Sequence, residues 1–259
     1  MKRRFEKWHG LGNDFVILEG TDLPTTDALA RDLCDRRHGI GADGILLVDT
    51  HPAIPSMTVR NADGSRPEMC GNGLRCVAAY LANAGGQPPI RVSTDAGDRL
   101  CQVTPTDRAT FDVTIEMGAA RLTGEMLASH RGRTLRFFLV DVGNPHAVTF
   151  DPIDPHELET LAPEIALRPP HGTNVELCTQ RPERISVVVW ERGVGPTLAC
   201  GTGACAVAAV ACETGRAPFD APLAIELPGG ILHITISRDT RLIRMRGPAV
   251  RVFTGELDL

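Results

Sequence analysis

Lysine is nearly missing from this chain of 259 residues: the two lysines, Lys2 and Lys7, both lie close to the N-terminus. Enzymes that use pyridoxal phosphate hold it as a Schiff base on a lysine inside the site. A lysine close to the N-terminus is poorly placed to form that Schiff base. Pyridoxal phosphate is therefore not expected, and no other cofactor is predicted.

A second missing pattern is the C-x-x-C pair, which does not occur although the chain has eight cysteines. Zinc sites usually contain closely spaced cysteine and histidine ligands, so no metal is expected. A secreted disulfide framework is disfavoured by the chain length and by the lack of an apolar run after the opening MKRRFEK. Most of the thiols are expected to be small core residues.

Long apolar runs and an excess of basic charge are also lacking. No stretch approaches the roughly 20 apolar residues of a membrane helix. The net charge is -5, which disfavours binding to nucleic acid or to an anionic membrane. We therefore expect a cytoplasmic protein whose partner is a small molecule, with neither nucleic acid nor membrane involved.

What the chain does contain is one internal repeat. Residues 70–85, CGNGLRCVAAYLANAG, align without a gap to residues 200–215, CGTGACAVAAVACETG. A second pair lies at nearly the same offset, with Gly-Asn at 12–13 and again at 143–144. A single duplication at half the chain length argues against a solenoid and for two similar halves.

The pattern of apolar residues predicts the elements of these halves. Ten alternating or β-branched runs read as strands, among them FVILE, GILLV and ISVVVWE. Helices are predicted over 26–37 and in the two CG-x-G segments, which end at Gly85 and Gly215. The latter two are apolar all round and should be buried.

The predicted fold is therefore α/β (α+β), with two pseudosymmetric domains that each wrap a curved, barrel-like sheet around a buried helix. The predicted boundaries are 1–108 for the N-terminal half, which carries Cys70, and 109–246 for the C-terminal half, which carries Cys200. The final strand, 247–259, is expected to join the N-terminal half.

Cys70 and Cys200 each precede the first free backbone amides of a buried helix. Those amides and the helix dipole attract an anion such as a carboxylate, and the same field favours a thiolate. Two such thiols in one cleft could remove and return a proton on opposite faces of an α-carbon. That is a two-base racemisation, without a cofactor.

Other interpretations stay open at this point. Both cysteines could be buried residues at helix starts, which is the expected role of Cys76, Cys205 and Cys212. A cysteine hydrolase is disfavoured because no motif ties a histidine to either thiol. A dinucleotide site is disfavoured because neither segment completes G-x-G-x-x-G.

Short polar loops supply candidate substrate contacts. They contain Asn13, Asn61, Asn144, His146 and Asn174. Taken singly, each asparagine is as readily explained as a turn residue. Glu191 and Arg192 end the apolar run ISVVVW, so their charges should emerge from a buried strand, where Arg can pair with a carboxylate and Glu with an ammonium. A surface ion pair is the alternative.

The motifs HGLGNDF, HGIGADG, RNADGS, MCGNGLRC, GNPH, TNVE, WERGVGPTLACGTGACA and PGG occur in the order found in the diaminopimelate epimerases. The chain resembles that family over nearly its whole length. The resemblance implies the two-domain α/β fold and the cofactor-free interconversion of LL- and meso-2,6-diaminopimelate, a step toward lysine and peptidoglycan. It also implies a homodimer.

The resemblance assigns roles by motif. Cys70 and Cys200 look like the paired acid and base, and His146 and Glu191 look like residues that support activity. The expected substrate contacts are Asn13, Asn61, Gly71, Asn72, Asn144, Asn174, Glu191, Arg192, Gly201 and Thr202. Gly44 stands where some members have Gln, so only its backbone is available there. A two-cysteine racemase of another amino acid, or an amino-acid-binding protein with this fold, are the alternatives.

Overall fold

The computed structural model describes residues 2–20, 27–51, 53–67 and 69–258. The chain divides into two compact units, which are Met1–Ile115 with Gly247–Leu259, and Glu116–Arg246. Strands β7 and β16 contribute residues to both units. Within the described residues, no helix combines the length and apolar character that crossing a membrane requires.

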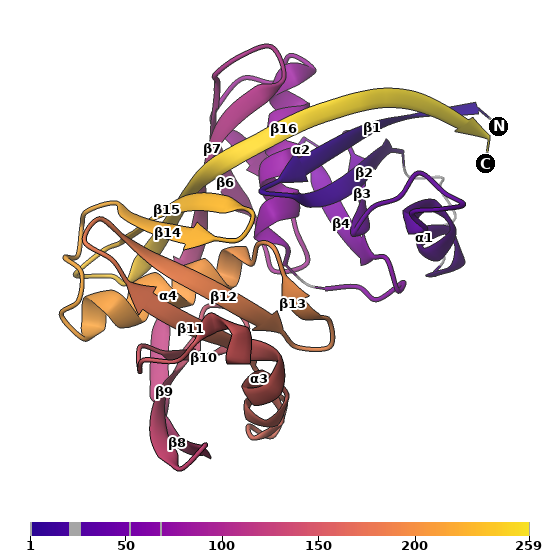
Figure 1. Ribbon diagram of the computed structural model, residues 1–259. Helices are drawn as coiled ribbons and strands as arrows, with labels where there is room; N and C mark the ends of the chain where they lie inside the picture. The colour runs from indigo at the N-terminus through magenta and orange to yellow at the C-terminus, as the bar shows by residue number, and fades with distance from the viewer. Residues whose placement is uncertain (1, 21–26, 52, 68, 259) are drawn as a thin grey trace. The chain divides into compact units, whose positions relative to one another are not determined.

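Unit 1 is built on one mixed sheet. Its elements are β1 Lys2–Gly10, β2 Asn13–Glu19, α1 Asp27–Cys34, β3 Gly44–Asp49, β4 Ser56–Asn61, α2 Gly71–Asn83, β5 Ile90–Val92, β6 Arg99–Pro105, β7 Thr110–Ala119 and the end of β16 Leu242–Asp258. The strand order is β4-β3-β2-β1-β16, with β2 and β3 parallel. The first and last strands run antiparallel side by side (Figure 1).

Unit 2 repeats this arrangement. Its elements are β8 Arg121–His130, β9 Arg133–Asp141, β10 Pro145–Thr149, the 3-10 turn Pro155–Glu157, α3 Leu158–Leu167, β11 Asn174–Gln180, β12 Arg184–Glu191, β13 Gly195–Thr197, α4 Gly201–Glu213, β14 Leu223–Leu227, β15 Gly230–Ile236 and the start of β16. The strand order β12-β11-β10-β9-β8 corresponds to β4-β3-β2-β1-β16 of unit 1, and β10 and β11 run parallel as β2 and β3 do. In unit 2, β12 and β14 are also parallel.

One nearly fully buried helix lies at the centre of each unit. Helix α2 packs on β1 to β6, and α4 packs on β9, β10, β11, β14 and β15 (Figure 1). Both end in the same way, because the backbone turns back at Gly85 and Gly215, each with a positive φ. Glycine tolerates that backbone, which closes the last helical turn. The predicted fold class is confirmed.

The structure also contains elements that the sequence analysis does not predict. Helix α3 occupies the place in unit 2 that α1 occupies in unit 1, between the two parallel strands. Pro163 lies inside it and reads as a helix breaker in the sequence. Strand β8 is also new, because its residues are mostly exposed and lack clear alternation. The predicted helix over 26–37 is the shorter α1, and residue 26 lies outside the described residues.

Candidate active site

Each of the two singled-out cysteines is the N-cap of a buried helix. The Cys70 sulfur accepts a hydrogen bond from the Gly73 amide at 3.3 Å before α2. The Cys200 sulfur accepts one from the Gly203 amide, also at 3.3 Å, before α4. The sulfur thus takes the place of the oxygen of a usual N-cap side chain. It lies in the positive end of the helix dipole, which favours a thiolate.

The glycine in the third helical position has a steric reason in both units. A Cβ at Gly73 would lie 2.9 Å from Leu46 Cδ2, and a Cβ at Gly203 would lie 2.8 Å from Glu176 Oε1. Each would also lie 3.3 Å from the sulfur of the capping cysteine. These glycines therefore let a side chain from β3 in unit 1, and from β11 in unit 2, reach the helix start.

Cys200 is buried among acidic groups. Burial is the largest cause that raises the pKa of its thiol well above the ordinary value, and the charges of Glu191 and Glu176 raise it further. Hydrogen bonds with the Thr202 hydroxyl, 3.5 Å from the sulfur, and with the Gly203 amide act in the opposite direction. The raised pKa favours the protonated thiol, the form that donates a proton.

The remaining thiols have no comparable surroundings. Burial raises the pKa of Cys76 and of Cys101 to about 12. It raises the pKa of Cys34 and of Cys212 to about 11. Burial is the largest cause in all four, and none of them caps a central helix, which agrees with a packing role for these residues.

In unit 1 a chain of hydrogen bonds fixes the amides beside Cys70. Buried Arg75 donates to Asn72 Oδ1 at 2.8 Å, and Asn72 Nδ2 donates to Asn13 Oδ1 at 3.1 Å. Asn13 Nδ2 then donates to Asp43 Oδ2 at 2.8 Å. Both side-chain amides are thereby oriented at the start of α2. The structure thus brings two predicted contacts, Asn13 and Asn72, together next to Cys70.

At Asp43 this chain of hydrogen bonds meets a cluster of charged side chains next to the start of β2. Lys7, one of the two lysines, is buried and pairs with Asp14 at 2.6 Å. Arg36 pairs with Asp14 at 2.6 Å and with Asp43 at 2.7 Å. Burial opposes ionisation of Asp14, but hydrogen bonds from Arg36 and Lys7 outweigh it and lower the pKa of Asp14 to about 2.

A pH-dependent contribution to stability follows from Asp14. Because its folded-state pKa is below the unfolded value, the stabilisation is complete above about pH 4 and is lost as the pH falls toward 2. We expect Asp14→Asn to unfold more easily than wild type at pH 6, with a gap that narrows from pH 4 to pH 2. Urea unfolding at a series of pH values measures this gap. Exposed Asp239→Asn should parallel wild type, and a constant gap for Asp14→Asn would contradict the assignment.

Asn61 and Gly44 face each other in the register of β4 and β3. Asn61 Nδ2 donates to Ser65 Oγ at 2.9 Å, and its backbone amide donates to the Ser65 carbonyl at the same distance. Asn61 is thus also the turn residue that its sequence suggested. A Cβ at Gly44 would lie 2.6 Å from the Arg60 carbonyl oxygen, so the backbone leaves no room for a side chain there.

In unit 2 the side chain of Asn144 lies beside the start of α4. Its Nδ2 donates to Thr202 Oγ1 at 3.4 Å, and its Oδ1 lies 3.0 Å from His146 Nε2. The other ring nitrogen, Nδ1, lies 2.6 Å from Glu176 Oε1. Three predicted residues, Asn144, His146 and Thr202, therefore form one hydrogen-bonded group that reaches the Cys200 sulfur.

Glu191 lies at the end of β12, beside Cys200. Burial raises the pKa of its carboxyl, and a hydrogen bond from the Thr197 hydroxyl at 2.6 Å opposes the rise. The neighbouring Cys200 thiol also acts to lower the pKa of this carboxyl. A carboxyl next to a thiol can exchange a proton with it, so Glu191 is placed to act on Cys200.

Asn174 begins β11, and Arg192 lies in the turn that follows β12. Asn174 Nδ2 donates to the Pro145 carbonyl at 3.1 Å, and its Oδ1 accepts from the Arg192 backbone amide at 2.9 Å. The Arg192 side chain donates to the His171 carbonyl and is exposed. Asn174 thus holds two loops of the site together in addition to its predicted role.

The register of the strands relates the two half-sites position by position. Phe15 pairs with Gly44 as His146 pairs with Asn174. The antiparallel neighbours then place Asn61 opposite Gly44. In unit 2 they place Trp190 opposite Val175, so Glu191 and Asn174 each lie one residue beyond this pair. The half-sites therefore share a backbone plan but differ in chemistry: unit 2 has ionisable side chains where unit 1 has apolar or amide ones.

Three residues at these half-sites were missed by the sequence analysis: Asp43, Arg75 and Glu176. Each is a charged residue, and Arg75 and Glu176 are fully buried. Their signal in the sequence is an isolated charge within an otherwise apolar segment, in GLRCVAA and TNVEL. A buried charge needs a partner, and such a position marks either a structural ion pair or a site.

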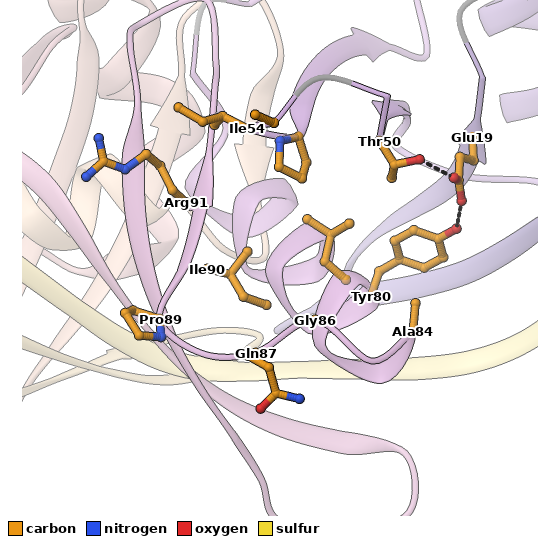
Figure 2. Close-up of a pocket in the computed structure, with 13 residues that line it drawn as sticks. Glu19, Thr50, Ile54, Tyr80, Ala84, Gly86, Gln87, Pro89, Ile90 and Arg91 are labelled. Carbon is orange, nitrogen blue, oxygen red and sulfur yellow. Dashed lines mark hydrogen bonds between the residues drawn. The ribbon is translucent and has the colours of Figure 1, made fainter.

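A cavity of about 580 Å³ in unit 1 lies elsewhere (Figure 2). It is bounded by the C-terminal end of α2, where Tyr80 and Thr50 both donate to the Glu19 carboxylate, at 2.6 and 2.5 Å. None of the predicted site residues lines it. Cys70 lies at the opposite end of the same helix, so this cavity is separate from the candidate site.

The fold identifies the class of protein first. The chain is similar to the crystal structure of a hydroxyproline epimerase from Agrobacterium vitis, with a TM-score of 0.74 over 99% of this chain and 91% of that chain. The sequence identity is 16%, so this likeness concerns the fold alone. The class is that of proteins that share the fold of this epimerase. In this chain a cysteine caps each central helix.

The particular family follows from the sequence comparisons. The family model for diaminopimelate epimerase matches residues 5–123 and 138–252. A diaminopimelate epimerase of Desulfitobacterium hafniense is 39% identical over 97% of this chain and 96% of its own length. One from Synechocystis sp. is 38% identical over the full length of both. The chain belongs to the diaminopimelate epimerase family.

Proposed function

We propose that this enzyme interconverts LL- and meso-2,6-diaminopimelate, a step in the supply of lysine and peptidoglycan precursors. The observation that carries the proposal is the pair of cysteines in identical N-cap geometry, in a chain that belongs to the diaminopimelate epimerase family. Location in the cytoplasm and assembly as a homodimer stay predictions.

The proposed reaction uses one thiol as base and the other as acid. A thiolate takes the α-proton, so that its S–H bond forms as the C–H bond breaks and the electron pair passes into the carboxylate. The second thiol donates its proton to the opposite face of the carbon. The configuration is inverted, and the two sulfurs have exchanged protonation states. Neither oxidation nor a cofactor is required by this balance.

The amides at the starts of α2 and α4 are proposed to bind the reacting carboxylate. Gly71 and Asn72 begin α2, and Gly201 and Thr202 begin α4. The N–H groups of a first helical turn point out from the helix start toward an anion, and here they would stabilise the charge that moves onto the carboxylate as the proton leaves. Such electrostatic stabilisation is commonly a large part of catalysis.

The remaining contacts are proposed for the ammonium group and for the distal amino-acid end of the substrate. Asn13, oriented by Asn72 and Asp43, has its amide fixed beside Cys70. Glu191 suits an ammonium group, and the exposed Arg192 suits a carboxylate. Asn61, Asn144 and Asn174 complete the proposed set. One amino-acid group needs fewer hydrogen-bond donors and acceptors than this set provides. A substrate with a second polar end accounts for the additional ones.

Solvent isotope exchange tests this function. In deuterated water, with no added cofactor, the reduced enzyme should incorporate deuterium at an α-carbon of LL-diaminopimelate and yield the meso isomer, detected by mass spectrometry and chiral separation. Absence of exchange would refute the proposal and favour a binding protein with the same fold. Exchange with another amino acid and none with diaminopimelate would favour a racemase of that amino acid.

A further inference from the structure

The side chains of His146 on β10 and Glu176 on β11 form a completely buried pair. Both are 0% exposed, and His146 Nδ1 lies 2.6 Å from Glu176 Oε1. Glu176 Oε2 is also buried and has no hydrogen-bond partner among the described residues. Burying a charged carboxylate with an unpartnered oxygen is unfavourable, so the pair requires an explanation.

The fold itself does not require this pair. In unit 1 the equivalent positions are Phe15 on β2 and Leu46 on β3, both buried. The geometry is closely matched, because Leu46 approaches Gly73 as Glu176 approaches Gly203. The same framework is therefore stable with two apolar side chains in place of an ionisable pair. Since such replacements are often neutral or stabilising, a function outside folding accounts for His146 and Glu176.

The hydrogen-bond partners of the imidazole determine where its protons are. Nε2 lies 3.0 Å from Asn144 Oδ1, an acceptor, so Nε2 must carry a hydrogen to make this bond. The short contact between Nδ1 and Glu176 Oε1 then holds one further proton, on the nitrogen or on the oxygen. In either form the pair has no net charge, which also lowers the penalty of burying Glu176.

The same reasoning gives a direction to the next two hydrogen bonds. Asn144 accepts from His146, so its Nδ2 faces Thr202 Oγ1 and donates to it at 3.4 Å. The Thr202 oxygen is thereby an acceptor, and its own hydrogen is free to point at the Cys200 sulfur, 3.5 Å away. Every donor in the chain points toward Cys200, which stabilises a thiolate at that sulfur.

We propose that Glu176 is a positioning residue, which holds the His146 ring through Nδ1 so that Nε2–H, Asn144 and Thr202 direct a hydrogen bond to Cys200. This role rests on the proposed function, because it matters only if Cys200 must alternate between thiol and thiolate. A negative charge on Glu191, and on Glu176 when it is not neutralised by His146, opposes a thiolate at Cys200. The hydrogen bond from Thr202, at the end of the donor chain, counteracts this effect.

Two substitutions of Glu176 separate positioning from packing. Glu176→Gln keeps the size and can donate an amide hydrogen to Nδ1 of a neutral ring, which leaves the hydrogen on Nε2. Glu176→Leu copies Leu46 of unit 1 and should fold, but it removes the contact that holds the ring. We expect kcat within about threefold of wild type for Gln, and about tenfold lower for Leu with KM within twofold. Glu183→Leu, on the exposed surface of the same unit, is the matched control and should behave as wild type.

Nitrogen NMR of protein labelled with ¹⁵N-histidine supplies a readout that packing alone would not change. His146 is assigned by the loss of its signals in His146→Gln. We expect a protonated Nε2 at neutral pH in wild type and in Glu176→Gln, and signals averaged between the ring tautomers in Glu176→Leu. An unprotonated Nε2 in wild type would overturn the proposal. So would a Glu176→Leu enzyme with wild-type kcat, or a Glu176→Gln enzyme as slow as the leucine variant.

The outcomes also distinguish this proposal from the function on which it rests. If wild type exchanges no α-proton of any amino acid, the function fails, whereas the protonation of His146 is still measured by NMR. If wild type is active and Nε2 carries no hydrogen, the function stands and the positioning role of Glu176 is wrong.

Discussion

Cys70→Ala and Cys200→Ala are each expected to reduce turnover of LL-diaminopimelate by roughly 10³-fold or more, because a positioned acid or base contributes about 10²–10⁴-fold. In the two-base reaction each sulfur is needed in both directions, once as base and once as acid. Loss of either leaves one face of the α-carbon without a proton donor or acceptor. Chiral analysis of the product, with a loading of enzyme high enough to detect residual turnover, measures the effect.

Cysteines inside the same helices provide the controls. Cys76 is completely buried in α2, and Cys212 lies near the end of α4, where its sulfur donates to the Pro218 carbonyl at 3.4 Å. Cys76→Ala and Cys212→Ala remove a sulfur without touching the helix starts, so they should retain activity per folded molecule. Wild-type turnover in Cys70→Ala or Cys200→Ala would rule out the two-base mechanism. Loss in all four variants, together with loss of helical circular dichroism, would indicate unfolding.

The repeat in the sequence predicted more of this site than any single motif. CG-x-G at two positions one half-chain apart indicated two capped, buried helices, and the structure shows the same cap in both. This inference succeeds because a cap depends on a few adjacent residues, and a buried helix depends on composition along one segment. Both properties are local, so they can be predicted from residues that lie close together in the sequence.

Helix α3 shows where local reasoning was insufficient and the repeat could have helped. Pro163 argues against a helix when the segment is read alone. Asp154, whose side chain accepts from the His156 amide at 3.0 Å, with Pro155 at the first position, argues for a helix start. The correspondence with α1 in the other half would have decided between the two.

The partners of the buried charged residues could not be predicted from the sequence, for a different reason. Glu176 and Arg75 meet their partners across the sheet or along the helix, and the partner of Glu176 lies 30 positions away in the sequence. Only the register of β10 against β11 brings His146 beside Glu176. At the equivalent strand positions unit 1 has Phe15 and Leu46, and this difference follows from the same register and has no signature in either motif.

The second large effect is expected from a single methyl group at the start of α4. In Gly203→Ala the new Cβ would lie 2.8 Å from Glu176 Oε1 and 3.3 Å from the Cys200 sulfur. Glu176 is enclosed on all sides, so the helix start and the thiol must shift. A displacement of about 1 Å from the reactive position can lower the rate about 10²-fold. We expect kcat to fall by about that factor, although alanine is the better helix former.

Gly215→Ala, at the other end of the same helix, is the matched control with the opposite pattern. Gly215 has a φ of +72°, and a Cβ there would meet nothing within 4 Å. The left-handed backbone makes alanine unfavourable, so the free energy of unfolding should fall by about 1 kcal/mol. The active site is untouched, so kcat should equal that of wild type. Steady-state kinetics and urea unfolding of both variants give the comparison. A Gly203→Ala enzyme with normal kcat would show that the fit of Gly203 against Glu176 and Cys200 does not govern catalysis. A Gly215→Ala enzyme with kcat lowered as strongly as in Gly203→Ala would show the same.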